Sequence, residues 1–154
     1  MQKKIVFTGG TGRFGEVFKT IKSKNKIFFP KKKQLNIENF KSIKIYLNKI
    51  KPSYLIHAAA LSRPMEIHEK KINKSIDINI IGTANIVKAC QEENIKLIYF
   101  STHYVYPGKK GNYSEKDPVL PFNNYSISKL GGECSVQMYS NSLILRICMT
   151  EKPF

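Results

Sequence analysis

Tyr125 and Lys129 are the two residues whose types and spacing point most clearly to acid–base chemistry. They lie in a segment with a helical pattern, four positions apart, so the phenol and the ammonium would share one face of a helix. A phenol titrates at about pH 10 in water, and a neighbouring cation favours the phenolate, which lets the hydroxyl pass a proton closer to neutral pH. Because Tyr and Lys at this spacing also occur by chance, a pair on a helix surface is the alternative.

A hydroxyl at the end of a neighbouring strand would complete this chemistry. Ser101 and Thr102 follow an apolar run and could hydrogen-bond the same carbonyl or alcohol oxygen to which Tyr125 gives its proton. Proton transfer to that oxygen, together with a hydride from a nicotinamide, reduces a carbonyl group. These residues therefore predict an oxidoreductase site, provided that the chain also binds a nicotinamide cofactor.

A glycine-rich stretch near the amino terminus is the candidate site for that cofactor. An apolar run from Ile5 to Thr8 leads into Gly9, Gly10, Gly12 and Gly15, which fit both G-x-G-x-x-G and G-x-x-G-x-x-G. Residues without a Cβ let the backbone turn sharply and approach a pyrophosphate, and the following helix offers unpaired N–H groups to the anion. A tight strand-to-helix turn that binds no ligand is the alternative.

The second expected strand, Ile27 to Phe29, bears on which dinucleotide would bind. In dinucleotide-binding folds an acidic residue near the end of this strand holds the adenosine ribose, whereas a basic residue receives a 2′-phosphate. Pro30 stands about where the acid would be, and Lys31 to Lys33 follow. We therefore expect NADP rather than NAD, with a solvated lysine turn as the alternative.

Hydrophobic periodicity predicts strands that alternate with helices along the whole chain. The helix after the glycines should run from Arg13 to about Ser23, with four apolar residues against the sheet: Phe14, Val17, Phe18 and Ile21. Further helices are expected over residues 40–50, 66–94 and 125–139, further strands over 54–57, 95–100 and 143–147, and a long loop over 101–124. Such alternation predicts an α/β fold with a doubly wound parallel sheet and right-handed crossovers.

The composition favours an ordinary globular protein. Lys and Arg number 26 against 11 Asp and Glu, a net charge of +15, but the lysines are scattered, so we interpret the charge as a compositional bias and expect no nucleic-acid partner. Cys90, Cys134 and Cys148 form neither a disulfide framework nor a zinc motif, which predicts a reducing compartment and no metal. The first apolar run is too short for a signal sequence and no stretch reaches membrane-spanning length, so we expect a cytoplasmic protein.

Six motifs in order along the chain resemble those of the extended short-chain dehydrogenase/reductase family. They are Thr8-Gly9-Gly10-Thr11-Gly12-Arg13-Phe14-Gly15, Leu35-Asn36-Ile37, Leu55-Ile56-His57-Ala58-Ala59-Ala60, Asn79-Ile80-Ile81-Gly82-Thr83-Ala84-Asn85, Tyr99-Phe100-Ser101-Thr102-His103-Tyr104-Val105-Tyr106-Pro107-Gly108 and the segment from Tyr125 to Glu133. The alanine turn and the last two motifs are most similar to those of the dTDP-4-dehydrorhamnose reductases within this family. The resemblance implies an NAD(P)-binding Rossmann fold.

The resemblance also implies a role for each matching residue. Thr102, Tyr125 and Lys129 would be catalytic: Tyr125 as proton donor, Thr102 polarising the carbonyl, and Lys129 lowering the pKa of Tyr125 while holding the nicotinamide ribose. Further cofactor contacts would come from Gly9, Thr11, Gly12, Arg13, Phe14, Gly15, Lys31, Asn36, Ile37, Ala58, Ala59 and Ala60. The cofactor would be NADP, the substrate a 4-keto nucleotide sugar for cell-surface polysaccharide, and a homodimer is compatible with the resemblance.

Departures from the family pattern leave alternatives open. The acid after the second strand is missing, and residues 146–150 stand where the reductases have an aromatic residue near the substrate. Family members also continue into a carboxyl-terminal lobe that closes over the nucleotide sugar, so we expect residues 1–154 to form the cofactor domain alone. The alternatives are an epimerase or dehydratase of the same family, a non-catalytic regulatory subunit that binds the cofactor, or a truncated remnant. His103 and Tyr104 weigh against a dehydratase, which typically has acidic residues there.

Overall fold

Five parallel strands form the centre of the structure, a computed structural model that describes residues 2–148. The strands are β1 (Lys4–Thr8), β2 (Lys26–Phe28), β3 (Tyr54–His57), β4 (Lys96–Thr102) and β5 (Ser142–Ile147). They lie in the order β2-β1-β3-β4-β5, and every neighbouring pair is parallel. The direction of winding reverses between β1 and β3, where doubly wound sheets open a crevice at the carboxyl ends of their strands. The predicted fold class is confirmed.

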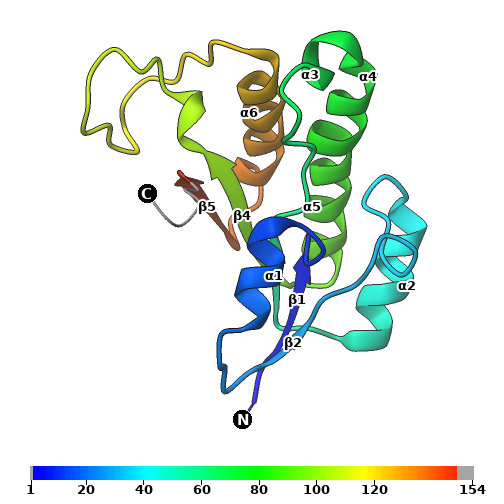
Figure 1. Ribbon diagram of the computed structural model, residues 1–154. Coiled ribbons are helices and arrows are strands. Elements are labelled where there is room, and N and C mark those ends of the chain that lie inside the picture. Colours follow the sequence, from blue (N-terminus) through cyan, green and yellow to red (C-terminus); the bar gives the residue numbers. More distant parts are fainter. Residues whose placement is uncertain (1, 149–154) are drawn as a thin grey trace.

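Helices cover the sheet unequally (Figure 1). One face carries α2 (Phe40–Ile50), α5 (Gly82–Glu92) and α6 (Asn124–Gln137), which pack against one another and against the strands, while α1 (Arg13–Lys19) lies on the other face. Local sequence signals set where two of these helices begin. The side chain of Asn39 accepts from the amide of Ser42 at the start of α2, and Asn123 forms a reciprocal capping box with Ser126 at the start of α6.

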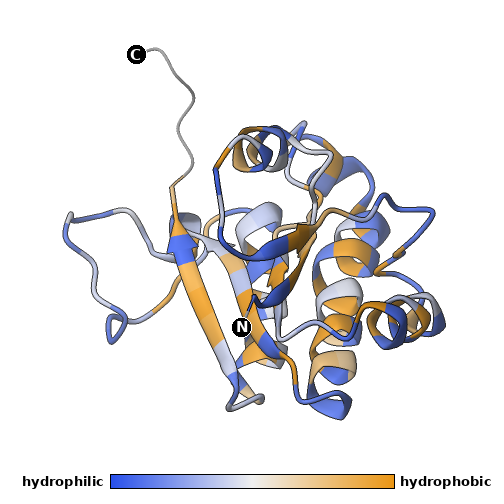
Figure 2. Cartoon of the chain, turned by 90° about the horizontal axis from the view of Figure 1, so that it is seen from below, coloured by the Kyte–Doolittle hydropathy of each residue, from blue (hydrophilic) through white to orange (hydrophobic). Residues whose placement is uncertain are grey.

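The two faces of the sheet have different cores. Between the sheet and the three-helix layer lie mainly aliphatic side chains, among them Leu55, Leu97, Ile43 and Ile86, all fully buried. The opposite face carries an aromatic cluster around Phe7, which contacts the rings of four other residues: Phe14, Phe18, Phe29 and Phe100. Figure 2 shows β5 as a mainly apolar strand at the edge of the sheet. Within residues 2–148, no helix is both long and apolar enough to cross a membrane.

The first helix is shorter than predicted. It ends at Lys19, where the hydroxyl and the amide of Thr20 both turn back to the carbonyl of Val17. Phe14 and Phe18 pack on the sheet as expected, but Val17 and Ile21 are more than half exposed. The two phenylalanines already fill the contact with Phe7, so the expected continuation of the apolar face to Ile21 is wrong.

The long helical segment over residues 66–94 is interrupted. It consists of α3 (Ile67–Lys70), α4 (Ile72–Ser75), a π-helix η1 (Ile76–Ile81) and then α5. The wider turn of a π-helix shifts the phase of the residues before it, and the apolar side chain of Ile76 is 38% exposed. The fourth strand is also longer than predicted, because Ser101 and Thr102 pair with Arg146 and Ile147 of β5.

Candidate active site

The glycine loop between β1 and α1 crosses the carboxyl end of the sheet. Gly9 has a φ of +81°, and a Cβ there would lie 2.7 Å from the backbone of Ala58 and Ala59; a Cβ on Gly15 would lie 2.5 Å from the Cα of Gly10. These two glycines are therefore required by the packing of the chain itself. A Cβ on Gly12 would meet only the carbonyl oxygen of Gly9, at 3.3 Å. The space beside Gly12 is open, as a loop that receives a phosphate group requires.

The turn after β3 borders this loop. The amide of Ala58 donates to the carbonyl of Thr8 and the amide of Ala59 to the Thr8 hydroxyl, both at 3.3 Å. Ala58, Ala59 and Ala60 are half-buried. The ends of β1 and β3 thus form the floor of the crevice, with small side chains that would let a flat ligand approach closely.

His57 joins this floor to the helical layer and was not among the expected site residues. It is fully buried, with Nδ1 2.8 Å from the Thr8 hydroxyl and Nε2 3.2 Å from the Thr83 hydroxyl. Since Thr83 donates its proton to the carbonyl of Asn79, it accepts from Nε2–H, and Nδ1 in turn accepts from Thr8. Burial lowers the pKa of His57 to about 3, so the ring is neutral and holds one tautomer.

The three candidate catalytic residues lie at the end of β4 and the start of α6. Thr102 closes β4, its hydroxyl accepts from the amide of Tyr104 at 3.2 Å, and it lies close enough to the phenol of Tyr125 to lower the pKa of that phenol. Tyr125 is the second residue of α6, and its ring lies 5.2 Å from that of His68. Lys129 follows one turn later, only 3% exposed, with Nζ 4.1 Å from the centroid of the Tyr99 ring. The structure therefore places Thr102 beside Tyr125 at the carboxyl end of the sheet.

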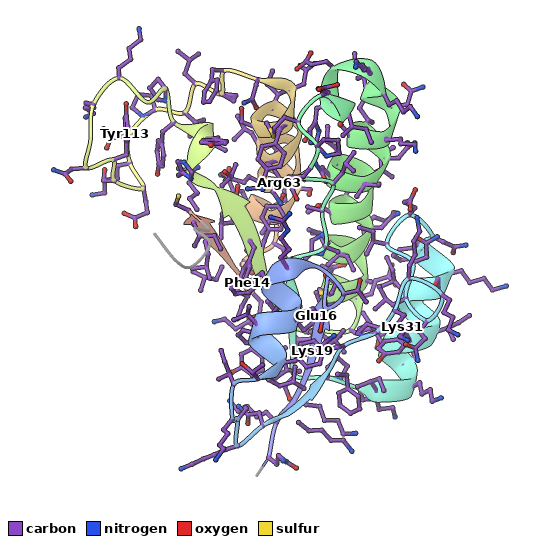
Figure 3. All side chains as sticks on the ribbon, in the orientation of Figure 1. Phe14, Glu16, Lys19, Lys31, Arg63 and Tyr113 are labelled. Atoms are coloured by element: carbon purple, nitrogen blue, oxygen red, sulfur yellow. The ribbon has the colours of Figure 1, made fainter. Side chains whose placement is uncertain are left out.

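The charges around Tyr125 differ from the expectation. Burial raises the pKa of its phenol, while the nearby Thr102 hydroxyl and the positive charge of Arg63 oppose the rise. Lys129, expected to lower this pKa, instead has its ammonium over Tyr99, and burial lowers its own pKa to about 7. In Figure 3 Arg63 lies between α6 and the start of α1. The composition gave no reason to single out Arg63.

The π-helix places a buried amide beside α6. Asn79, 1% exposed, donates to the carbonyl of Leu61 and the hydroxyl of Ser128, both at 2.9 Å, and accepts from the amide of Leu61 at 2.8 Å. A Cβ on Gly132 would lie 2.6 Å from the Tyr99 hydroxyl and 2.9 Å from the Asn79 carbonyl, so α6 packs against η1 without a side chain at this position. This packing sets the position of the helix that carries Tyr125 and Lys129.

The residues expected to contact the adenosine half of the cofactor do not lie together in one place. Ile37 is 8% exposed and belongs to the aliphatic core, and the side chain of Asn36 accepts from the amide of Glu38. Lys31 is exposed and lies beside α2 in Figure 3, apart from Phe14 at the start of α1. Phe14 packs in the aromatic cluster, with its ring 5.3 Å from that of Phe100. Lys31 is thus available to a ligand, whereas Ile37 and Phe14 have packing roles.

A parallel sheet with its switch point at a glycine loop, and a half-buried Tyr and a buried Lys on the adjacent helix, define an α/β protein of the dinucleotide-binding class. More particularly, the chain belongs to the family described as the RmlD substrate binding domain, whose profile matches residues 3–150. This match confirms the resemblance found in the sequence.

Individual relatives fall into two groups. The chain is 28% identical over 143 residues to methionine adenosyltransferase 2 subunit beta of Rattus norvegicus, covering 87% of this chain and 42% of the relative. It is 32% identical over 102 residues to dTDP-4-dehydrorhamnose reductase of Shigella flexneri, covering 65% and 34%. The crystal structure of dTDP-4-dehydrorhamnose reductase from Bacillus anthracis in complex with NADP matches with a TM-score of 0.88 and 29% identity, over 95% of this chain and 53% of that one. The chain spans about half the length of these proteins or less.

Proposed function

We propose that this chain binds NADP(H) and supplies the cofactor half of a reductase that acts on a 4-keto nucleotide sugar. The observation that supports this most is the proximity of Thr102 and Tyr125 at the carboxyl edge of the sheet, with Lys129 one turn further along α6. The family match and the NADP complex of the B. anthracis relative favour the same chemistry.

Each residue has a distinct task in the proposed reaction. Bound NADPH supplies the hydride. The Tyr125 hydroxyl donates a proton to the carbonyl oxygen of the sugar, and the Thr102 hydroxyl hydrogen-bonds that oxygen as negative charge develops on it. Lys129 holds the nicotinamide ribose, and because burial brings its pKa to about 7, it can return a proton toward Tyr125 after transfer. The space beside Gly12 receives the pyrophosphate, and Ala58 to Ala60 line the nicotinamide ribose.

The choice of NADP over NAD rests on the end of β2. Pro30 has no carboxylate with which to bind the ribose hydroxyls. The side chains of Lys31, Lys32 and Lys33 beside it are exposed and can bind a 2′-phosphate. Arg13, Thr11 and Asn36 would add contacts to the adenosine half of the cofactor. A nucleotide-sugar reaction of this kind also fits a cytoplasmic role in polysaccharide synthesis, with no nucleic-acid partner, and a homodimer is compatible with it.

A second candidate is a regulatory subunit that binds the cofactor without catalysis. It is favoured by the similarity to methionine adenosyltransferase 2 subunit beta, over 87% of this chain. An epimerase or dehydratase would use the same three residues. The chain spans about half the length of its relatives. For a reductase, an epimerase or a dehydratase, the sugar site would therefore need residues from a further segment or a partner.

Fluorescence titration of the chain with NADPH and NADH tests the cofactor assignment. We expect tighter binding of NADPH, and loss of that preference when Lys31, Lys32 and Lys33 are all replaced by Ala. Replacement of Lys22, Lys24 and Lys26 by Ala is the matched control, because it removes the same charge from exposed positions at the start of β2 and just before it. Tighter binding of NADH, or an unchanged preference in the first variant, would show that the lysine turn is only a solvated surface.

A further inference from the structure

A buried ion pair lies one helical turn beyond Lys129. The carboxylate of Glu133 is fully buried on α6, and the guanidinium of Arg146 reaches it from β5. Arg146 Nε lies 3.2 and 3.1 Å from the two carboxylate oxygens, and Nη2 lies 2.8 Å from Oε2. This forked geometry is the strong form of a charge-assisted hydrogen bond. None of the proposed catalytic steps uses either residue.

The same guanidinium is held on its other side by the loop that precedes α6. Arg146 Nη1 donates to the Tyr106 hydroxyl at 2.9 Å, and Tyr106 donates to the carbonyl of Ser114 at 2.9 Å. The Tyr106 ring stacks on that of Tyr113, which Figure 3 labels in the loop. The hydrogen bonds to Glu133 raise the pKa of Arg146 further above its ordinary value, so the guanidinium remains charged at every working pH.

Lys129 lies in an environment with little to balance its charge. It is faced by His57 from β3 and by Tyr99 from β4, and its own helix places Tyr125 before it and Glu133 after it. Burial lowers the pKa of Lys129 to about 7, and the negative charge of Glu133 opposes that change. Among residues 2–148, no carboxylate lies within ion-pairing distance of the Lys129 ammonium, so Glu133 acts on it through space.

We propose that Glu133 and Arg146 together set the charge of Lys129: Glu133 supplies the anion that favours the ammonium, and Arg146 offsets most of that anion's field. Charges interact over several ångströms in a poorly solvated interior, so removing either member of the pair changes the field at Lys129. The two removals have opposite signs. Loss of the Glu133 charge leaves Arg146 to repel the ammonium, whereas loss of the Arg146 charge leaves Glu133 to attract it.

The opposite signs of the two effects distinguish a role in setting the charge of Lys129 from a merely structural role of the ion pair. A buried ion pair that only holds β5 against α6 would lose stability when either partner is removed, and its two variants would act in the same direction. Glu133 and Arg146 are therefore positioning residues for Lys129 that act through its charge, and the measurement that tests them is the titration of Lys129 itself.

The experiment is an NMR titration of the side-chain Cε signals of the full chain labelled with 13C-lysine, in which the Lys129 signal is assigned by its loss in Lys129→Met. We expect a titration midpoint of about 7 for Lys129 in the wild type, well below that of exposed lysines, because burial lowers its pKa more than Glu133 raises it. Glu133→Gln should lower the midpoint by on the order of one pH unit, and Arg146→Met should raise it by a similar amount. The double variant should return it close to the wild-type value.

Two controls keep the result interpretable. Arg146→Lys preserves the charge and should leave the midpoint close to that of the wild type, and Tyr106→Phe removes a hydrogen bond to Arg146 without a charge and should do the same. If Arg146→Met does not fold, because it leaves Glu133 buried and unpaired, the Glu133→Gln and double variants still decide the matter. Midpoints that move in the same direction, or that stay fixed in Glu133→Gln, would overturn the proposal.

The consequence for cofactor binding rests on the proposed function and is measured separately. At pH 7.5, Glu133→Gln should weaken NADPH binding several-fold, because less of Lys129 is charged, while Arg146→Met should not weaken it. Failure of the wild type to bind NADPH would refute the proposed function without affecting the titration. Opposite shifts of the Lys129 midpoint in Glu133→Gln and Arg146→Met, together with NADPH binding by the wild type, would support both the tuning of Lys129 and the proposed function.

Discussion

Replacement of Gly12 should separate cofactor binding from folding. Gly12 has a φ of −85° and a ψ of 168°, which any residue adopts, and a Cβ there meets only the Gly9 carbonyl oxygen at 3.3 Å. Gly12→Ala should therefore change the free energy of unfolding by less than about 1 kcal/mol. Gly12→Val places two further methyl groups in the space proposed for the pyrophosphate. We expect it to weaken NADPH binding by about 100-fold or more, equivalent to roughly 2.7 kcal/mol.

Gly15→Ala is the matched control for this prediction. A Cβ at Gly15 would lie 2.5 Å from the Cα of Gly10 and 2.6 Å from the Gly9 carbonyl, so the loop and α1 must move apart. Overpacking of this kind costs about 1–3 kcal/mol, which lowers the melting temperature by several degrees. Thermal unfolding and NADPH titration of the three variants provide the two readouts. NADPH binding that is unchanged in a folded Gly12→Val variant would refute the assignment of this loop to the cofactor.

Substitutions at three further residues test the catalytic edge of the sheet. In a fusion with the carboxyl-terminal half of the B. anthracis reductase, Tyr125→Phe should lower turnover by about 100-fold or more and change NADPH affinity little, because it removes the transferred proton and keeps the ring; a steady-state assay of NADPH oxidation checks this. In His57→Gln the side chain can still accept a hydrogen bond from Thr8 and donate one to Thr83, whereas in His57→Leu it can do neither. NADPH affinity should therefore be largely kept in His57→Gln and reduced in His57→Leu. Equal NADPH affinities of the two variants would refute a positioning role for His57. Lys129 loses its proton near pH 7 in the folded chain but at about pH 10.4 when unfolded, so the unfolded state binds more protons between these values. The free energy of unfolding should therefore rise with pH across this window in the wild type and rise less in Lys129→Met, as chemical denaturation at several pH values would show.

The elements that are fixed by local sequence could be predicted well. The helix expected over residues 40–50 has these bounds in the structure, because Asn39 caps its start and Lys51, with a φ of 51°, ends it directly before Pro52. The parallel sheet followed from strands that alternate with helices, each long enough for a crossover. In the same way, the spacing of Tyr125 and Lys129 on one helix and the position of Thr102 at the end of a strand could be read from residue types alone.

Features that depend on tertiary contacts could not be predicted. The π-helix exists where the Asn79 amide reaches the backbone of Leu61, eighteen positions away, and periodicity in one segment does not report such a contact. The orientation of the Lys129 ammonium toward Tyr99 depends on how α6 crosses β4. The motif N-x-x-G-T-x-N was recognisable in the sequence and could have indicated Asn79, but nothing in the spacing joined Glu133 to Arg146.

The adenine side shows a different limit. Asn36 and Ile37 match a family motif, yet Ile37 is a core residue that packs close to Gly82, where a Cβ would lie 3.0 Å from its side chain. A motif can therefore mark a position that shapes the binding surface from beneath instead of contacting the ligand. Met149 and Thr150, which were expected to matter for sugar specificity, lie outside the described residues.

Transfer of deuterium from [4-2H]NADPH to a sugar tests the central claim most directly. The chain would be joined to the carboxyl-terminal half of the B. anthracis reductase, and the fusion first shown to bind both NADPH and a dTDP-sugar. With dTDP-4-keto-6-deoxy-sugar as substrate, we predict one deuterium at C4 of the product by mass spectrometry, and its loss in Tyr125→Phe. A fusion that binds both ligands but transfers no deuterium would contradict the proposed reductase and favour a regulatory, cofactor-binding role.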